Sequence, residues 1–167
     1  MNEDNFKSSL REKTLEHLFV GQLLRCLWAN GQRDVEALRP EVNDAGYDVA
    51  IECSNVTRHI QLKFSFRGAT TRQVKVNTRL AAKPSGCVIW LNFDRRDLSL
   101  GPFLWFGGKP GKRLPDIADL PVGKHTKANA KGTKAERPNT RVLRRSQFTE
   151  LTSIEDVVNR LFGDGGR

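Results

Sequence analysis

The sequence predicts an α/β domain in which a mixed β-sheet is flanked by helices. Three observations indicate this class: helical periodicity at the N-terminal end, two adjacent runs with period-two alternation, and a second helical pattern near the C-terminal end. The 167 residues are most simply one domain, 1–167.

The first helix is predicted from Asp4 to Asn30, where the Asn-Gly pair is a usual C-terminal signal. Its apolar positions share one broad face, which is formed by Leu15, Phe19, Leu23, Cys26 and Leu27. Glu16 falls in the middle of that face, where a carboxylate is costly unless it is paired or ligates a metal. Two readings follow for Glu16: a functional carboxylate, or a salt bridge to a core-facing Arg or Lys.

A first strand is expected from Val35 to Val42, and a hairpin follows it. Its two runs, Tyr47 to Ser54 and His59 to Phe66, alternate apolar and polar residues, so each buries one face. If Cys53 pairs with Arg58, the remaining apolar residues of the first run each face an apolar residue of the second. The same register sets Asp48 opposite Lys63, with Gln61 one diagonal step away. A slip by two residues would preserve the faces.

The remaining elements follow from local patterns. They are a short helix around Val76 to Ala82, strands at Cys87 to Phe93 and Phe103 to Phe106, a long basic loop at 107–141, and a C-terminal helix at 153–162 that Ser153 caps. The loop is rich in Lys, Gly and Pro. A solvated flexible loop and an electrostatic arm for a phosphate backbone explain this composition equally well.

The charge balance indicates a polyanionic partner. With 28 Lys and Arg against 19 Asp and Glu, the net charge is +9, which attracts polyanions, of which nucleic acid is the commonest. A merely basic soluble protein is the alternative. The candidate nucleic-acid-binding residues are Arg67, Arg72, Lys75, Lys109, Lys112, Arg113, Lys124, Lys127, Lys131 and Lys134. The sequence has no apolar stretch of about 20 residues and no leader-like N-terminus, so a cytoplasmic protein without membrane contact is expected.

Cysteine, histidine and tryptophan positions limit other chemistry. The three cysteines form no CxxC pair and are expected as small buried side chains, and the spacing of the three histidines argues against zinc. Trp28, Trp90 and Trp105 sit in apolar runs and are expected in the core.

The polar face of the hairpin, together with Glu16, suits a divalent cation such as Mg²⁺ or Mn²⁺. Asp48 and Glu16 would supply charge, and the Gln61 amide oxygen and the Leu62 carbonyl would complete the protein ligands. A water on the metal would be the nucleophile, which Lys63 would orient or deprotonate. The candidate catalytic residues are therefore Glu16, Asp48, Gln61 and Lys63.

Glu16, then Asp48, then Gln61-Leu62-Lys63 resembles the PD-(D/E)XK nuclease superfamily, in the variant where Glu-x-Lys becomes Gln-x-Lys. The helix EHLFVGQLLRCLWANG and the GYD strand are similar to the openings of archaeal Holliday-junction resolvases and restriction-endonuclease-like domains. The resemblance covers roughly residues 1–95 and implies a restriction-endonuclease-like core and Mg²⁺-dependent hydrolysis of DNA phosphodiesters. Tyr47 stands where the superfamily has proline, and Gln61 removes one acidic ligand.

Other acids could compensate for Gln61. Glu52 shares the face of Asp48, although a cross-strand pair with His59 is its simpler reading, and Glu41 and Asp44 precede the strand. The alternatives to a nuclease are a catalytically inactive nucleic-acid-binding or protein-interaction module of the same fold, and a structural protein with a salt-bridged Glu16. DNA or RNA, and the biological role, stay open, and a homodimer would suit cleavage of two strands.

Overall fold

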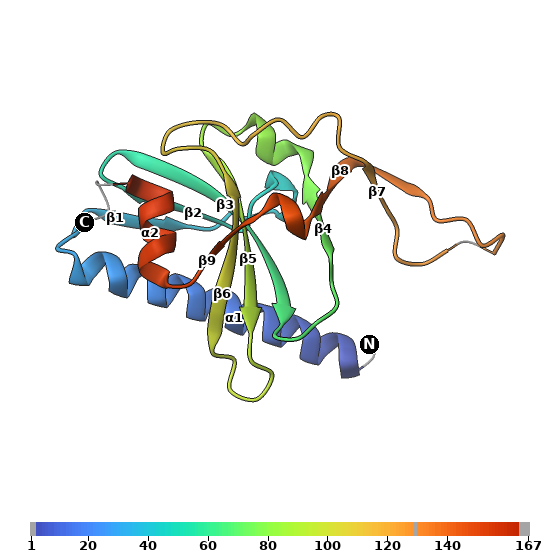
Figure 1. Cartoon of the computed structure of the whole chain (residues 1–167), viewed down its shortest axis with the longest axis horizontal. Helices are drawn as coiled ribbons and strands as arrows, with labels where there is room; N and C mark the ends of the chain where they lie inside the picture. The colour runs from blue at the N-terminus through green and yellow to red at the C-terminus, as the bar shows by residue number, and fades with distance from the viewer. Residues whose placement is uncertain (1–2, 129, 164–167) are drawn as a thin grey trace.

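The computed structural model describes residues 3–128 and 130–163, and its class is α/β as predicted (Figure 1). The helices and strands, in chain order, are α1 (Glu3–Ala29), β1 (Val35–Leu38), β2 (Val49–Cys53), β3 (Val56–Phe66), β4 (Gln73–Asn77), β5 (Gly86–Phe93), β6 (Leu100–Gly107), β7 (Val122–Lys124), β8 (Glu136–Arg144), β9 (Thr149–Leu151) and α2 (Ile154–Phe162). Short 3-10 helices are η1 (Asn43–Ala45), η2 (Thr78–Ala82) and η3 (Arg145–Gln147).

Two sheets organise the described residues. The larger has six strands in the order β1-β2-β3-β5-β6-β9, and it is mixed because β3 and β5 run parallel while its other neighbours run antiparallel. The smaller has three antiparallel strands in the order β4-β8-β7. The connection from β3 to the parallel β5 passes through β4 and η2, so one strand of the small sheet lies within this crossover.

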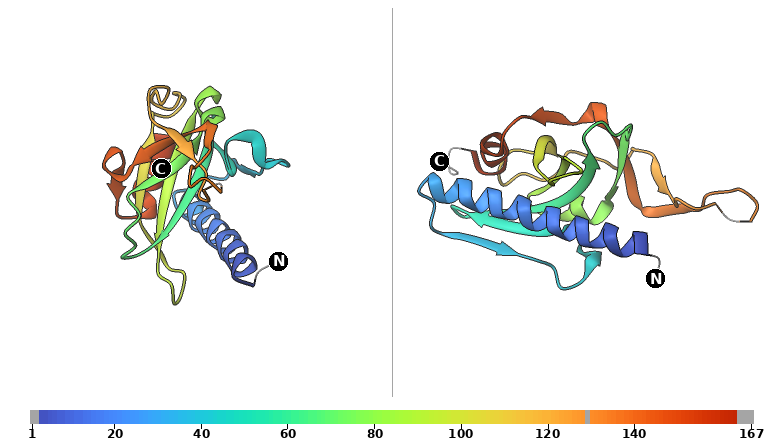
Figure 2. Two further views of the ribbon diagram at one scale, coloured as in Figure 1. Left: turned by 90° about the vertical axis from the view of Figure 1, so that its right-hand side faces the viewer. Right: turned by 90° about the horizontal axis from the view of Figure 1, so that it is seen from below.

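The main core lies between α1, α2 and one face of the six-stranded sheet (Figures 1 and 2). The predicted apolar face of α1 is buried, with Leu15, Phe19, Leu23 and Leu27 fully inaccessible. Helix α2 begins at the predicted capping box, in which Ser153 and Asp156 bond each other's backbone N–H groups. Burial of these two apolar faces is what holds both helices against the sheet.

A second core lies on the opposite face of the six-stranded sheet. It contains Val76, Leu80, Val88, Leu114, Ile117 and Leu143, from β4, η2, β5, β8 and the chain between β6 and β7. The prediction of one loop over 107–141 is therefore wrong in part, because Leu114 and Ile117 pack into this core and β7 pairs with β8. Strand β7, the first part of β8 and the chain that joins them form an arm that projects from the body (Figures 1 and 2).

The register of the β2–β3 hairpin differs by two residues from the predicted one. Cys53 pairs with Val56 and Val49 with Ile60, so Cys53 does not face Arg58. Ser54 and Asn55 have φ angles of 52° and 62°, as a two-residue type I′ turn requires. A shift by two residues leaves the faces unchanged, so alternation alone did not fix the register.

Other predicted elements also need correction. The first strand ends at Leu38 rather than Val42, and the predicted short helix is a strand, β4, followed by the 3-10 helix η2. Trp28 is 63% exposed, with the Arg33 guanidinium 3.7 Å from its ring centroid, because it lies one position past the buried stripe of α1. Trp90, Trp105 and the three cysteines are buried as predicted. Among the described residues no helix has the length and apolarity to cross a bilayer.

Candidate active site

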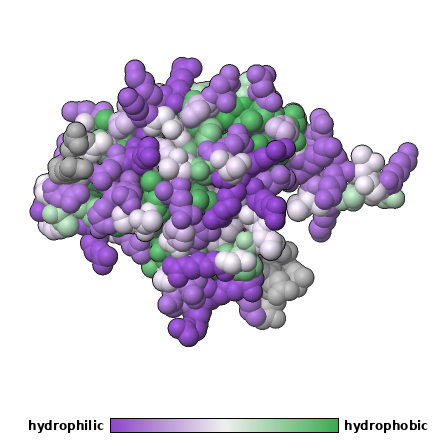
Figure 3. All heavy atoms as spheres, in the orientation of Figure 1, coloured by the Kyte–Doolittle hydropathy of each residue, from purple (hydrophilic) through white to green (hydrophobic). Residues whose placement is uncertain are grey.

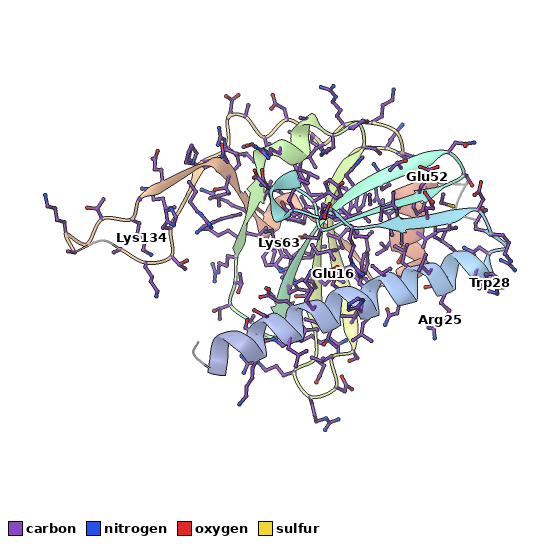
Figure 4. All side chains as sticks on the ribbon, turned by 180° about the vertical axis from the view of Figure 1, so that it is seen from behind. Glu16, Arg25, Trp28, Glu52, Lys63 and Lys134 are labelled. Atoms are coloured by element: carbon purple, nitrogen blue, oxygen red, sulfur yellow. The ribbon has the colours of Figure 1, made fainter. Side chains whose placement is uncertain are left out.

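A pocket of about 450 Å³ opens where β3 continues beyond its pairing with β2. Its lining residues are Glu12, Lys13, Glu16, Asp48, Leu62, Lys63 and Phe64. The structure thus brings three of the four predicted catalytic side chains together, from α1, from the residue before β2 and from β3. In Figure 4, Glu16 and Lys63 lie near the point where α1 crosses the strands.

Asp48 is held at the open edge of β3. The Leu62 backbone N–H donates a hydrogen bond of 2.6 Å to its Oδ2, so Asp48 does not face Lys63 as a cross-strand partner, contrary to the prediction. Burial raises the pKa of Asp48; the Leu62 hydrogen bond and the Lys63 charge oppose this, and the Glu16 charge adds to it. Among the described residues, none bonds its second oxygen, Oδ1, which leaves that oxygen to the pocket.

Lys63 is a half-buried ammonium at the boundary of this pocket. Burial lowers its pKa, and the charges of Asp48 and Glu12 only partly offset that shift. No side chain or carbonyl among residues 3–128 and 130–163 lies within hydrogen-bonding or ion-pair distance of its Nζ. The Lys63 Nζ is therefore open to a ligand in the pocket.

Glu16 is buried and ion-paired. Its Oε2 accepts from Lys13 Nζ at 2.9 Å and its Oε1 from Arg39 Nε at 2.7 Å. Burial alone would raise its pKa, but the hydrogen bonds from Lys13 and Arg39 outweigh this and leave the pKa lowered. The salt-bridge alternative is therefore present, although both cations are substantially exposed rather than core-facing.

Gln61 points away from this pocket. Its Oε1 accepts a 3.1 Å hydrogen bond from the Asn77 backbone N–H, and it lines a neighbouring cleft that Lys63 also lines. The structure therefore does not bring the Gln61 amide together with Asp48 and Glu16. Gln61 has the same strand parity as Lys63, but the hydrogen bond from the Asn77 N–H directs its amide toward β4.

The predicted metal ligands offer few oxygens that are available to a metal ion. Within the described chain no three His, Cys, Asp or Glu side chains cluster as a metal site. Asp48 Oδ1 is available, and the Leu62 carbonyl points to the same side of β3 as its N–H, toward Asp48. Such a sparse set fits Mg²⁺, which typically binds one or two carboxylates plus substrate phosphates and keeps several waters.

The other candidate acids lie outside the pocket. Glu52 pairs with Thr57, whose Oγ1 donates to it at 2.7 Å, so the predicted Glu52–His59 pair is wrong. Asp44 is ion-paired with Arg79, and Glu41 is exposed.

The predicted nucleic-acid-binding residues form several groups. Lys124, Lys127, Lys131 and Lys134 are exposed on the arm, where Figure 4 labels Lys134 far from the pocket. Lys109, Lys112 and Arg113 are exposed after β6, and Arg72 is exposed before β4. Lys75 is half-buried and donates to the Lys124 carbonyl, and Arg67 is held by Gly101, Ser99 and Asp94. Hydrophilic residues cover much of the surface seen in Figure 3, which has the orientation of Figure 1.

Sequence reasoning missed the role of Arg58. It is fully buried on the apolar side of β3 and bonds carbonyl groups of α2 and of the chain after β6. A signal was present, because Arg58 has the same strand parity as Ile60, Leu62 and Phe64.

Comparison of the chain with family models, with curated proteins and with solved structures finds no match.

Replacement of Asp48 by asparagine is expected to raise the melting temperature by a few degrees at neutral pH. Asparagine still accepts the Leu62 N–H but carries no buried charge. Because the folded pKa of Asp48 is raised, wild-type stability falls as pH rises from the ordinary aspartate pKa through the folded value. The difference between variant and wild type should therefore shrink toward acidic pH, which thermal melts across pH measure.

The control for this pH series is Asp119→Asn, which removes one charge at an exposed loop position. It should melt with the wild type at each pH. A lower melting temperature for Asp48→Asn at neutral pH would mean that the folded site favours the ionised carboxylate, against the raised pKa.

Proposed function

We propose that the protein is a metal-dependent nuclease with a restriction-endonuclease-like core, which hydrolyses DNA phosphodiester bonds at the Asp48 pocket. One observation supports this most strongly: Glu16, Asp48 and Lys63, distant in sequence, line one pocket beside an open strand edge. Their order along the chain and their element types agree with the PD-(D/E)XK resemblance.

The residues of the pocket suggest a division of roles. Asp48, fixed by Leu62, presents Oδ1, and the Leu62 carbonyl lies on the same side. Mg²⁺ bound there would polarise a phosphoryl oxygen and make a water more acidic. Lys63, whose pKa is lowered by burial, would take a proton from the attacking water. Lys13, which lines the pocket and is ion-paired with Glu16, would meet phosphate charge there.

A second candidate is a catalytically inactive nucleic-acid-binding or protein-interaction module of the same fold. It is favoured by the contacts of the other two predicted ligands, because both Glu16 oxygens are ion-paired and the Gln61 oxygen is bonded by Asn77. Only Asp48 then offers a free carboxylate oxygen among the predicted ligands.

The deciding experiment incubates the purified protein with supercoiled, linear, single-stranded and four-way-junction DNA in Mg²⁺, in Mn²⁺ and in EDTA. Cleavage should require metal, and Asp48→Asn should reduce it about 10²-fold or more, because it removes the charged pocket oxygen. Asp119→Asn is the matched control and should cut as the wild type does.

Two results would overturn the proposal that the protein is a nuclease. One is the absence of wild-type cleavage in either metal together with salt-sensitive DNA binding, which is the outcome expected of the inactive module. The other is cleavage that Asp48→Asn retains, which would place the chemistry elsewhere or in a contaminant.

A further inference from the structure

A second cleft of about 410 Å³ lies next to the candidate active site, between β3 and the three-stranded sheet. Half-buried residues of β3, β4 and β8 line its floor, and exposed residues at the base of the arm line its rim. Lys63 lines both this cleft and the Asp48 pocket, so the two spaces adjoin.

The cleft is positively charged. Lys63, Lys75 and Arg137 contribute cations, and Glu136 is the one carboxylate among the residues that line it. Lys75 bonds the Lys124 carbonyl, whereas the side chains of Lys63 and Arg137 meet no acceptor within hydrogen-bonding distance in the described part of the chain. Two such cations beside one cleft favour a phosphate as ligand.

Amide side chains provide donors of another kind. The Gln61 oxygen is bonded by the Asn77 N–H and the Asn77 side-chain oxygen by the Arg79 N–H, so the NH₂ group of each amide is its free end. Asn139 adds a third amide at the rim. Amide groups of this kind bond the edges of nucleobases, which are accessible when the base is unpaired.

We propose that this cleft binds one unpaired nucleotide of a nucleic-acid strand, with its phosphate between Lys63 and Arg137 and its base against the amides of Gln61 and Asn77. Its volume of about 410 Å³, near the lower end of the roughly 300–1,000 Å³ typical of ligand pockets, suits one nucleotide. Binding of the nucleotide does not depend on the proposed function. Only its place next to the cleaved phosphodiester rests on that function.

The arm gives the strand a path out of the cleft. His125 follows β7 directly and lines the cleft, and Lys127, Lys131 and Lys134 are exposed further along the chain between β7 and β8. This part of the chain projects from the body in Figure 1. The strand would therefore run from the Asp48 pocket over Lys63, through the cleft and along the arm, with backbone contacts to lysine on the way.

The test measures binding without cleavage, in EDTA, by the fluorescence anisotropy of a short labelled single strand and of the duplex of the same sequence over a series of salt concentrations. The single strand should bind more tightly than the duplex. Arg137→Gln should weaken single-strand binding about tenfold and reduce the slope of log K against log salt by about 0.7. Arg96→Gln, the matched control in the exposed loop between β5 and β6, should leave both unchanged.

Tighter binding of the duplex, or an Arg137→Gln protein that binds the single strand as the wild type does, would overturn the inference. The two proposals can fail separately because binding is measured without metal. If the wild type cuts DNA but Arg137→Gln binds the single strand normally, the proposal for the cleft is wrong and the nuclease proposal stands. If the wild type cuts nothing but Arg137→Gln binds the single strand more weakly, the proposal for the cleft stands and the nuclease proposal is wrong.

Discussion

Replacement of Arg58 by leucine is expected to lower the free energy of unfolding by about 3–5 kcal/mol. For a chain of this size that corresponds to a fall in melting temperature of roughly 6–20 °C. Arg58 is fully buried, and its guanidinium donates to five acceptors: the carbonyl oxygens of Gly108, Lys109, Arg160 and Leu161, and Ser85 Oγ. These match the five N–H donors of arginine, so the side chain is fully satisfied.

The expected loss follows from what the acceptors would lack. Arg160 and Leu161 lie in the last turn of α2, where carbonyl groups have no partner within the helix and carry the negative end of its dipole. Leucine would leave them without this donor beside a fully buried side chain. Arg58→Lys should be intermediate, because an ammonium has three donors and cannot reproduce the planar fork.

Thermal and urea unfolding measure this loss. Arg160→Leu is the control, since the Arg160 side chain is exposed and only its backbone carbonyl contacts Arg58. It should change stability by no more than about 0.5 kcal/mol. If Arg58→Leu were as stable as the wild type, the five hydrogen bonds would only balance the cost of burying the charge.

Much of the fold could be predicted because burial leaves a strong periodic signal. The apolar stripe of α1, the alternation in β2 and β3, the continuous apolar run of β5 and the capping box of α2 are each fixed by one rule. Strands β4 and β8 were missed for the converse reason. Much of β8 is exposed and rich in charged residues, so it shows no alternation, and its pairing with β4 is not local.

The sequence predicted which residue types share a face at the candidate site, but not which atoms contact one another. Placing Glu16 on the buried face of α1, and Asp48 and Lys63 on adjacent strands, was enough to bring all three to one pocket. The hydrogen bond from Leu62 to Asp48 depends on a register that alternation does not determine. The Arg39 partner of Glu16 and the Asn77 partner of Gln61 come from segments whose positions only tertiary structure sets.

Replacement of Lys63 by glutamine is expected to reduce kcat for DNA cleavage on the order of 10²–10⁴-fold, if the proposed function holds. Lys63 is the ammonium of the Asp48 pocket with no hydrogen-bonding partner among the described residues, and burial lowers its pKa. A lowered pKa increases the neutral fraction at a given pH, which a general base requires. Measurement of kcat at saturating DNA separates this loss from weaker binding in the neighbouring cleft, and Arg96→Gln is again the control.

Lys63→Arg distinguishes a proton acceptor from a fixed charge. Arginine retains the positive charge but stays protonated, so it should lose nearly as much activity as glutamine if Lys63 acts as the base. Wild-type kcat/KM should rise with pH up to the lowered pKa of Lys63, because the base must be neutral, and Lys63→Arg should lose this dependence on pH. Near-wild-type cleavage by Lys63→Arg would instead assign Lys63 to stabilising phosphoryl charge, and the proton would then leave the attacking water for solvent or for the substrate phosphate.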